Sequence, residues 1–406
     1  MSTHGRMTRP ALLLAAIVTL GAAPALAAGV YGPGASDGEI KLGQTMPYSG
    51  FASSVSTLGK AELAYFAKVN AEGGVNGRKI TMISLDDGYS PPKTVEQTRR
   101  LVEQENVLFI FGSLGTAPNA AIRKYLNGRK VPQLFINSGA TEMADPERYP
   151  WTMKWMPSLR LEGRIYAQYL LKEKPDAKIG VLYQNDDFGR DYLDGFVAGL
   201  GPDGAKRILG KEAYETTDPT IGSQLIKLRG LGVDTLFLIT SGKASAQAIS
   251  VARQQFGPDA LLIVPTVATS IVGILQPAGL DNAKGVVSAA LNKNPADPSW
   301  ANDPGYLEYL AWMKQYMPDA DIADSGYVAG YTEAQAIVEV IRRCGDELTR
   351  ENVMKQATSI QGMTLPMLIP GITVTTGPAD YNPIKQLRLE RFDGAQWNLF
   401  GEATGG

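Results

Sequence analysis

The chain has 406 residues, of which 44% are hydrophobic and 20% charged, and this composition excludes both a disordered chain and a membrane protein with many spans. It contains one histidine, His4, and one cysteine, Cys344. These counts argue against a histidine base or a cysteine–histidine pair, and they exclude a zinc cluster and an intrachain disulfide. Catalysis through carboxylates, lysine, tyrosine or a serine–lysine pair stays open.

The N-terminal segment has the pattern of a cleaved secretory signal peptide. Arg6 and Arg9 precede an apolar run over residues 11–27, which Pro24 interrupts and which ends in Ala-Leu-Ala. A membrane anchor needs about 20 uninterrupted apolar residues, so we favour cleavage after Ala27. Loss of the two arginines leaves 37 basic residues against 41 acidic ones, a net charge of −4.

The remaining chain is expected to be a periplasmic protein with no histidine, because His4 leaves with the signal peptide. A mildly acidic protein has no electrostatic attraction to nucleic acid or anionic lipid, so we expect neither as a partner. No cysteine lies at the cleavage site, and we therefore expect no lipid anchor. Cys344 is expected to be an inert core residue.

Short apolar runs alternate with amphipathic stretches along the rest of the sequence. The runs typical of strands cover residues 40–45, 79–85, 107–111, 132–136, 178–183, 234–240 and 261–265. The stretches typical of helices include residues 60–72, 117–126, 188–200, 224–231, 244–256, 306–316 and 327–344, and a helix that begins at Pro91. This order predicts an α/β fold of parallel sheets flanked by helices, in two domains of roughly 130 to 200 residues with a ligand cleft between them.

Common catalytic and metal-binding motifs are absent from the sequence. It contains no Walker phosphate loop, no GxSxG element and no EF-hand loop. The pairs Asp86-Asp87 and Asp186-Asp187 follow strands without further ligands nearby, so we interpret them as solvated strand-end or helix-cap residues. A hydrolase that uses Asp186 or Lys243 remains an alternative, although no nucleophile–base pair is visible.

Two loops that follow strands carry the strongest functional signal. In residues 111–119, small residues precede a helix, so the backbone N–H groups near Gly115, Thr116 and Ala117 can face an anion. Residues 137–141 follow the next strand and offer two hydroxyls and further amides. Successive strand ends lie side by side in a parallel sheet, so we predict a shared ligand site; tight structural turns are the alternative.

Several short motifs occur in an order that resembles a known family. They are Ile40-Lys-Leu-Gly with Ser49-Gly50, Asn70-Ala-Glu-Gly-Gly-Val-Asn-Gly-Arg78, Asp86-Asp87 with Pro92-Lys93, Gly112-Ser-Leu-Gly, Tyr183-Gln-Asn-Asp-Asp-Phe-Gly189 and Gly330-Tyr331. Together, from about Glu39 to Trp397, the chain resembles the periplasmic solute-binding proteins of ABC importers for branched-chain amino acids (Leu, Ile and Val) and related ligands, including members that bind aromatic or other organic acids.

The resemblance implies a two-lobed type I periplasmic-binding-protein fold with three hinge crossovers, expected near Met156, Ser288 and Thr375. The first lobe would contain residues 29–156 plus 289–375, and the second residues 157–288 plus 376–406. Carried over from the family, the ligand contacts comprise first-lobe loop residues, second-lobe closing residues and first-lobe neighbours. They fall on Gly115, Thr116, Ala117, Ser138, Gly139, Ala140 and Thr141; on Phe188, Ser241 and Thr266; and on Tyr48, Phe51, Tyr89 and Leu114.

Departures from the family pattern shape the ligand prediction. Thr266 stands where amino-acid binders carry a glutamate for the ligand ammonium, and Ser241 stands where a tyrosine is usual. The family's frequent disulfide is missing, since its positions match Tyr89 and Gly115. A buried ammonium without a carboxylate costs on the order of several kcal/mol, so the resemblance favours a carboxylate without an amine, such as a benzoate or a phenylpropenoate.

We therefore expect a monomeric receptor without catalytic activity, metal or cofactor that delivers a small organic acid to the transmembrane subunits of an ABC permease. A branched-chain amino acid, an amide or urea is the alternative ligand. A ligand sensor that signals to a partner protein is the alternative role. Whether Tyr48, Phe51 or Tyr327 reaches the cleft is left open by the sequence.

Overall fold

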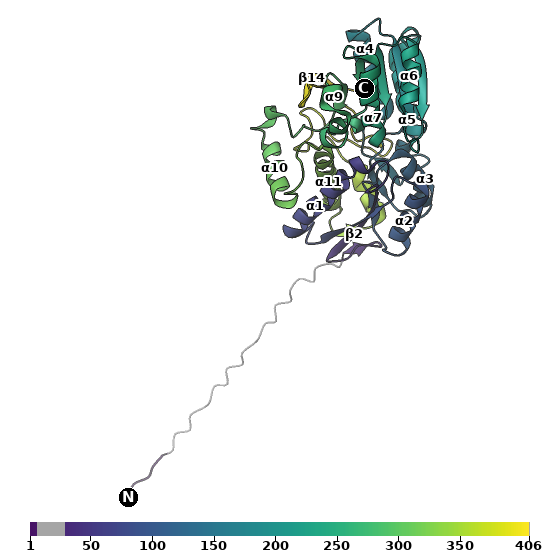
Figure 1. The fold of residues 1–406 in the computed structure, drawn as a ribbon. Coiled ribbons are helices and arrows are strands. Elements are labelled where there is room, and N and C mark those ends of the chain that lie inside the picture. Colours follow the sequence, from purple (N-terminus) through teal and green to yellow (C-terminus); the bar gives the residue numbers. More distant parts are fainter. Residues whose placement is uncertain (6–28, 406) are drawn as a thin grey trace.

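The computed structural model describes residues 1–5 and 29–405, so most of the expected signal segment lies outside the described residues. Two α/β lobes lie one above the other, with α1, α2 and α3 in the lower lobe of Figure 1 and α4 to α7 in the upper one. Within the described part of the chain, no helix is long and apolar enough to cross a membrane.

The first lobe is built on a five-stranded sheet whose strands are all parallel. In spatial order the strands are β3 (Lys79–Asp86), β2 (Glu39–Met46), β4 (Phe109–Phe111), β5 (Gln133–Ile136) and β6 (Thr152–Lys154). The helices of this lobe are α1 (Thr57–Ala71), α2 (Pro91–Glu103), α3 (Thr116–Gly128), α10 (Pro304–Tyr316), α11 (Ser325–Cys344) and α12 (Arg350–Ala357). Helices α1 and α11 pack against each other, although some 250 residues separate them.

The second lobe is built on a seven-stranded sheet. In spatial order its strands are β14 (Trp397–Thr404), β13 (Leu387–Phe392), β11 (Val287–Ala290), β10 (Leu261–Ile263), β9 (Thr235–Ile239), β7 (Ile179–Gln184) and β8 (Ile208–Tyr214). The helices around it are α4 (Leu159–Glu173), α5 (Asp187–Ala205), α6 (Gly222–Gly230), α7 (Gly242–Phe256), α8 (Gln276–Ala278) and α9 (Leu280–Ala283).

Short elements complete the fold. They are a two-stranded parallel pair, β1 (Val30–Tyr31) with β12 (Glu347–Leu348), and the single-turn segments η1 (Ser53–Val55), η2 (Thr141–Ala144), η3 (Thr266–Ala268), η4 (Ile271–Leu275) and η5 (Pro298–Trp300). The predicted parallel sheets flanked by helices are confirmed in both lobes, and in the second lobe β11, β10, β9, β7 and β8 are parallel to one another. At the edge of that sheet, β13 runs antiparallel to β11 and to β14, and a tight turn of residues 393–396 joins β13 to β14.

The order of strands takes the chain from one lobe to the other three times. It leaves the first sheet after β6, returns after β11 and leaves again between α12 and β13. Ser288 itself lies inside β11. The crossovers near Met156, Ser288 and Thr375, and the lobe boundaries drawn from them, stay a proposal.

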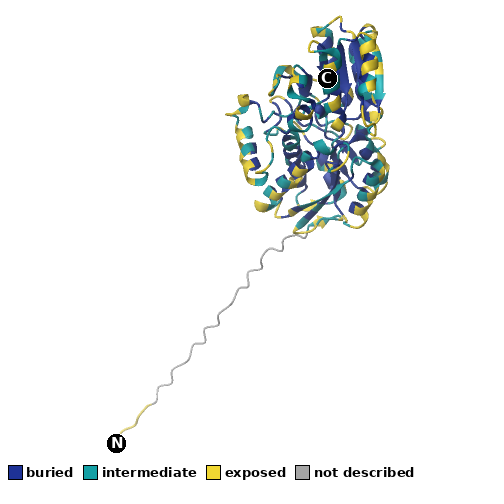
Figure 2. Ribbon diagram, in the orientation of Figure 1, coloured by how far each residue is buried: buried dark blue, intermediate teal, exposed yellow. Residues whose placement is uncertain are grey.

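The core follows from the apolar runs of the parallel strands. Strands β4, β5 and β9 are buried along their whole length, and exposed residues gather on the outer helices (Figure 2). Tyr309 and Trp312 are buried packing residues, and their rings contact Tyr331. Cys344 is buried, and burial raises the pKa of its thiol to about 12, which keeps it protonated and unreactive.

The acidic pairs at strand ends behave as caps, with one correction. Asp186 precedes α5 and accepts a hydrogen bond from the N–H of Gly189 at 3.2 Å, as expected for a helix cap. Asp87 is fully buried instead of solvated. Its carboxylate accepts the N–H of Tyr89 at 2.9 Å and the hydroxyl of Thr94 at 2.8 Å, which satisfies the buried charge and holds the start of α2.

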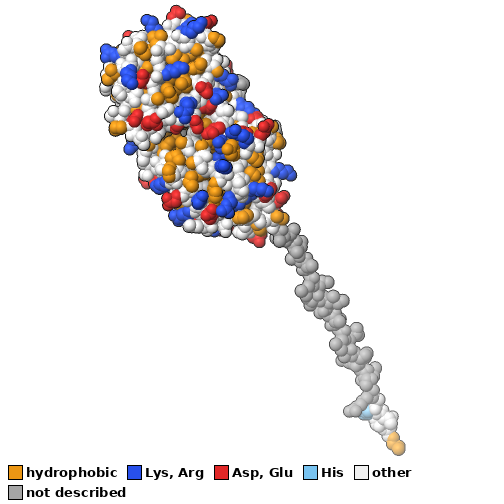
Figure 3. All heavy atoms as spheres, turned by 90° about the vertical axis from the view of Figure 1, so that its right-hand side faces the viewer, with side chains coloured by type: hydrophobic (Ala, Val, Ile, Leu, Met, Phe, Trp, Pro, Cys, Tyr) orange, Lys and Arg blue, Asp and Glu red, His pale blue; other side chains and the backbone are white. Residues whose placement is uncertain are grey.

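The outer surface carries both signs of charge. On the face drawn in Figure 3, lysine and arginine side chains are interspersed with aspartate and glutamate and form no continuous basic stripe.

Candidate functional site

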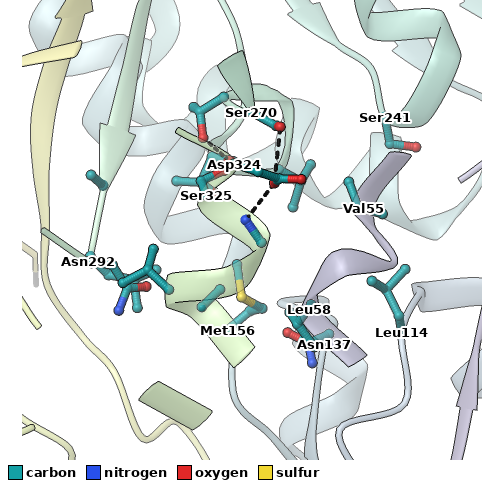
Figure 4. A pocket seen from close by; sticks show the side chains of 18 of the residues that line it. Val55, Leu58, Leu114, Asn137, Met156, Ser241, Ser270, Asn292, Asp324 and Ser325 are labelled. Carbon is teal, nitrogen blue, oxygen red and sulfur yellow. Dashed lines mark hydrogen bonds between the residues drawn. The ribbon is translucent and has the colours of Figure 1, made fainter. Parts of the chain in front are cut away.

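A cavity of about 190 Å³ lies between the two lobes, at the carboxyl ends of strands from both sheets. In Figure 4, Val55, Leu58, Leu114 and Asn137 border it from the first lobe, while Ser241 and Ser270 border it from the second. Open α/β sheets place ligands at these strand ends, because the loops that follow parallel strands converge there.

The first predicted loop forms one wall of this cavity at the start of α3. Gly115 is the N-cap residue with φ 104°, a left-handed conformation that favours glycine, and a Cβ atom here would lie 2.6 Å from the ring of Tyr89. The side-chain amide of Asn119 donates to the Gly115 carbonyl at 2.8 Å and holds the loop in place. The N-terminal amides of α3 therefore begin at the cavity wall, where the helix dipole favours an anion.

The second predicted loop contributes a hydroxyl beside the first. The hydroxyls of Thr116 and Ser138 lie 2.8 Å apart and are hydrogen-bonded, so the two loops do converge as expected. Gly139 also lines the cavity, and a Cβ atom there would lie 2.1 Å from the carbonyl oxygen of Pro157, so no larger residue fits.

The amides of this second loop are less free than the sequence indicated. The N–H of Ala140 donates to the Ser138 hydroxyl at 3.3 Å. The N–H and hydroxyl of Thr141 both donate to Asp191 on α5, at 2.8 and 2.9 Å. The structure therefore places Thr141 in a contact between the lobes and keeps Ala140 off the cavity wall.

All three predicted residues of the second lobe line the cavity. Phe188 packs edge-on against Tyr192 with ring centroids 5.1 Å apart. The hydroxyl of Ser241 donates to Gln184 at 2.7 Å. Thr266 donates its N–H to one carboxylate oxygen of Glu162 at 2.8 Å and its hydroxyl to the other at 3.1 Å.

The predicted set divides into residues on the cavity wall and residues off it. Those on the wall are Tyr89, Leu114, Gly115, Thr116, Ser138, Gly139, Phe188, Ser241 and Thr266. Those that the structure places off it are Tyr48, Phe51, Ala117, Ala140 and Thr141, and Tyr327 also lies off the wall.

Two aromatic residues among the latter have structural partners. The hydroxyl of Tyr48 is hydrogen-bonded to Ser84 at 2.7 Å, and burial raises its pKa to about 12. The ring of Phe51 lies 5.9 Å from that of Tyr89, a residue that does reach the cavity. Burial and the nearby Asp186 carboxylate raise the pKa of Tyr89, so its hydroxyl is a neutral donor. Phe51 thus packs against Tyr89.

Sequence reasoning missed two buried carboxyl groups on the cavity wall. Asp324 caps α11 by accepting the N–H of Gly326 at 2.9 Å, and it accepts the hydroxyl of Ser270 from the other lobe at 3.3 Å (Figure 4). Burial raises the pKa of Asp324. An acidic residue before a helix signals a cap but not a cavity. Glu390 lies in β13, where nothing in the local sequence points to a site.

A buried lysine lies behind the second loop. The Nζ atom of Lys154, at the end of β6, donates to the carbonyl oxygen of Gly139 at 3.0 Å, and the side chain is fully buried. Burial lowers the pKa of this ammonium to about 8, against the opposing attraction of Asp191 and Asp380. At neutral pH a positive charge therefore lies behind the loop that carries Ser138, which favours an anion in the cavity.

The groups on the cavity wall are suited to binding a small molecule. The wall combines hydroxyls, helix N-terminal amides and apolar side chains, which can hold a small molecule with one anionic end. Among residues 1–5 and 29–405, no three His, Cys, Asp or Glu side chains are grouped to hold a metal ion. Two α/β lobes that enclose a cavity at their strand ends define a bilobal solute-binding protein.

Comparison with known proteins agrees with this class. A family model described as periplasmic binding protein matches residues 39–396. Over 342 residues the chain is 23% identical to Leu/Ile/Val-binding protein homolog 7 of Brucella abortus. The matched region covers 82% of this chain and 81% of that protein. The chain belongs to the periplasmic binding protein family, whose members bind small molecules and deliver them to ABC permeases.

Solved structures share the fold. A branched-chain amino acid ABC transporter protein from Thermus thermophilus with bound valine has a TM-score of 0.81 and 17% identity, covering 91% of this chain and 97% of that one. A solute-binding protein from R. palustris in complex with benzoate has a TM-score of 0.76 and 18% identity, covering 91% of this chain and 98% of that one. At these identities the structural similarity shows the two-lobed fold alone, and the two bound ligands differ.

Proposed function

We propose that the protein is the periplasmic substrate-binding component of an ABC importer and that it captures a small organic carboxylate, best an aromatic one, between its lobes. The hydroxyl pair of Thr116 and Ser138 at the N-terminus of α3 carries this proposal. Hydroxyls and helix N-terminal amides bind carboxylates through charge-assisted hydrogen bonds. Lys154, behind the same loop, adds a positive charge.

The remaining wall supports an apolar body on the ligand. Val55, Leu58, Leu114, Trp155 and Phe188 all border the cavity. An engineered cavity of about 150 Å³ with similar apolar walls binds benzene. A cavity of about 190 Å³ is therefore large enough for one aromatic ring with a carboxylate.

Capture would proceed by closure of the two lobes. Thr116 and Ser138 come from the first lobe, whereas Phe188, Ser241 and Thr266 come from the second. A ligand that contacts both sets stabilises the closed form only, and so it shifts the population toward the form that a permease recognises. This step needs no covalent chemistry.

An α-amino acid is the second candidate, and the carboxyls of Asp324 and Glu390 favour it. Thr266 replaces the glutamate expected for an ammonium, but these two carboxyls border the same cavity from other elements. An ionised carboxylate at either position would pair with an ammonium. The relative named for Leu, Ile and Val binding is consistent with this alternative.

Calorimetric titration of the purified protein with matched acids separates the two candidates. We expect benzoate or cinnamate to bind with micromolar or tighter affinity and leucine and valine to bind at least about tenfold more weakly, a difference of about 1.4 kcal/mol. Binding of leucine without binding of any aromatic acid would favour the amino-acid candidate instead. Urea serves as a control for an uncharged amide, and size-exclusion chromatography tests the proposed monomer.

A further inference from the structure

Glu390 is a buried acid on the cavity wall that the carboxylate site described above does not use. It lies in β13 of the second-lobe sheet, directly opposite Ser288 of β11, and only 4% of its surface is exposed. The same side chain borders the cavity, together with Ala289, Ala290 and Trp397. Its small exposed surface therefore faces the space between the lobes.

The neighbouring carboxyl groups of Glu390 and Glu162 differ in the hydrogen-bond donors that surround them. Glu162 accepts hydrogen bonds from the hydroxyls of Tyr166 and Tyr192, both at 2.7 Å, and from the N–H and hydroxyl of Thr266. Burial raises the pKa of Glu162, and these four donors oppose that effect by stabilising its charged form. Within residues 29–405, burial and the charge of Glu162 are what raise the pKa of Glu390, and no hydrogen bond to its carboxyl group lowers it.

This contrast determines the protonation of Glu390. A second negative charge beside Glu162, in a buried place with no donor, is strongly unfavourable, and burial raises the pKa of Glu390 to about 8. At neutral pH Glu390 is therefore a carboxylic acid with one O–H donor and one carbonyl acceptor. The carboxyl oxygens of Glu390 are not among the fully buried polar atoms that lack a partner, so they stay accessible from the cavity and a bound molecule can supply their hydrogen bonds.

We infer that Glu390 is a specificity-determining ligand contact, which holds a hydroxyl group on the part of the ligand away from the Thr116–Ser138 pair. This inference rests on the proposed capture of an aromatic carboxylate. A hydroxyl both donates and accepts a hydrogen bond, as a neutral carboxylic acid does, so the two groups match in both directions. The favoured ligand is then a hydroxylated aromatic acid.

The positions of the two contacts also fit closure. Thr116 and Ser138 belong to the first lobe, and Glu390 belongs to the sheet of the second lobe. A ligand with a carboxylate at one end and a hydroxyl elsewhere makes directional hydrogen bonds to both lobes at once. Benzoate would meet the second lobe through apolar contacts alone and would leave Glu390 without a partner.

The test compares benzoate with its three hydroxy isomers by calorimetry, in the wild-type protein and in Glu390→Gln and Glu390→Leu. In the wild type, the best hydroxybenzoate should bind about tenfold more tightly than benzoate. Glu390→Leu should reduce this ratio to near one, because leucine offers neither a donor nor an acceptor to the ligand hydroxyl. Glu390→Gln keeps one donor and one acceptor on a side chain of the same size, so this variant should retain most of the preference for the hydroxybenzoate. It also serves as a control for correct folding.

Three results would overturn the inference. They are a wild-type protein that binds benzoate but does not prefer any hydroxy isomer, a preference that survives unchanged in Glu390→Leu, and tighter binding of 4-(aminomethyl)benzoate than of every hydroxybenzoate. The last result would mean that the acid is ionised and pairs with a cation. If no aromatic acid binds to the wild type, it is the proposed function that fails, and the two failures are thereby distinguished.

Discussion

The carboxylate of Asp191 accepts two hydrogen bonds from Thr141, one from its backbone N–H at 2.8 Å and one from its hydroxyl at 2.9 Å. Thr141 begins η2 in the first lobe, and Asp191 lies on α5 in the second. Arg160 of α4 donates to the same carboxylate at 2.6 Å. This contact therefore joins the lobes beside the cavity and uses both hydrogen-bond donors of Thr141.

We predict that Asp191→Ala weakens ligand binding without removing any ligand contact. Loss of hydrogen bonds to a charged group costs about 1.5 to 3 kcal/mol, so the closed form should become less populated and Kd should rise roughly tenfold or more. Calorimetry gives Kd, and small-angle scattering of the ligand-free and ligand-saturated protein gives the degree of closure.

Asp194→Ala is the matched control for this change. Asp194 also pairs with Arg160, at 3.0 Å, but both residues belong to the second lobe. This variant should bind as the wild type does. Equal effects of the two substitutions would show that Arg160, and not the contact between lobes, sets the affinity.

Thr116→Val and Ser138→Ala should each weaken binding of an aromatic carboxylate by about tenfold, because each removes one hydroxyl from the proposed carboxylate site. The two hydroxyls bond to each other, so the double variant should lose less than the product of the single effects. Calorimetry of all three variants measures this coupling. Thr217→Ala, at an exposed position, is the control. Unchanged affinity in the double variant would contradict the assignment of this site.

Lys154→Met should stabilise the protein at pH 7 and lose this advantage near pH 10. The folded-state pKa of Lys154 is lowered to about 8, against an ordinary value of about 10.4, so the charged form is disfavoured in the folded protein. Below pH 8 both states hold the proton and the burial cost is fully present. Between pH 8 and 10.4 only the unfolded state keeps the proton, so wild-type stability rises by roughly 3 kcal/mol.

Urea denaturation of wild type and Lys154→Met at pH 7 and pH 10 measures this difference. Lys172→Met, which changes an exposed lysine on α4, should show no pH-dependent difference from the wild type. A Lys154→Met variant that is less stable at pH 7 would mean that the bond to the Gly139 carbonyl outweighs the cost of burial.

Expression of the full chain in a bacterial host should yield a periplasmic protein that begins at Ala28, because cleavage is predicted after Ala27. Intact mass spectrometry of the periplasmic fraction identifies the N-terminus. Replacement of Ala27 by a bulky leucine should block cleavage and leave the longer mass. A wild-type protein that retains residues 1–27 would contradict the signal-peptide prediction.

Local sequence determined much of this architecture. The alternation of apolar runs and amphipathic stretches predicted the parallel strands, and helical spacing placed α10 and α11 within two residues of their observed starts. Strand and helix periodicity reflects burial on one face of an element, which is a property of neighbouring residues. The same local logic located the loops of Thr116 and Ser138, since the ends of adjacent parallel strands must converge.

The tertiary structure alone decided which of the remaining residues reach the cavity and what they do there. Thr141 was predicted to bind ligand, but Asp191, fifty residues away, takes both of its donors. Asp324 and Glu390 reach the same wall from a helix cap and a late strand. Their burial, and the partners available to each, depend on how the two lobes pack. The hydrogen-bond partner of a polar group depends on its distance from residues that are far away in the sequence. Its neighbours along the chain do not determine that distance.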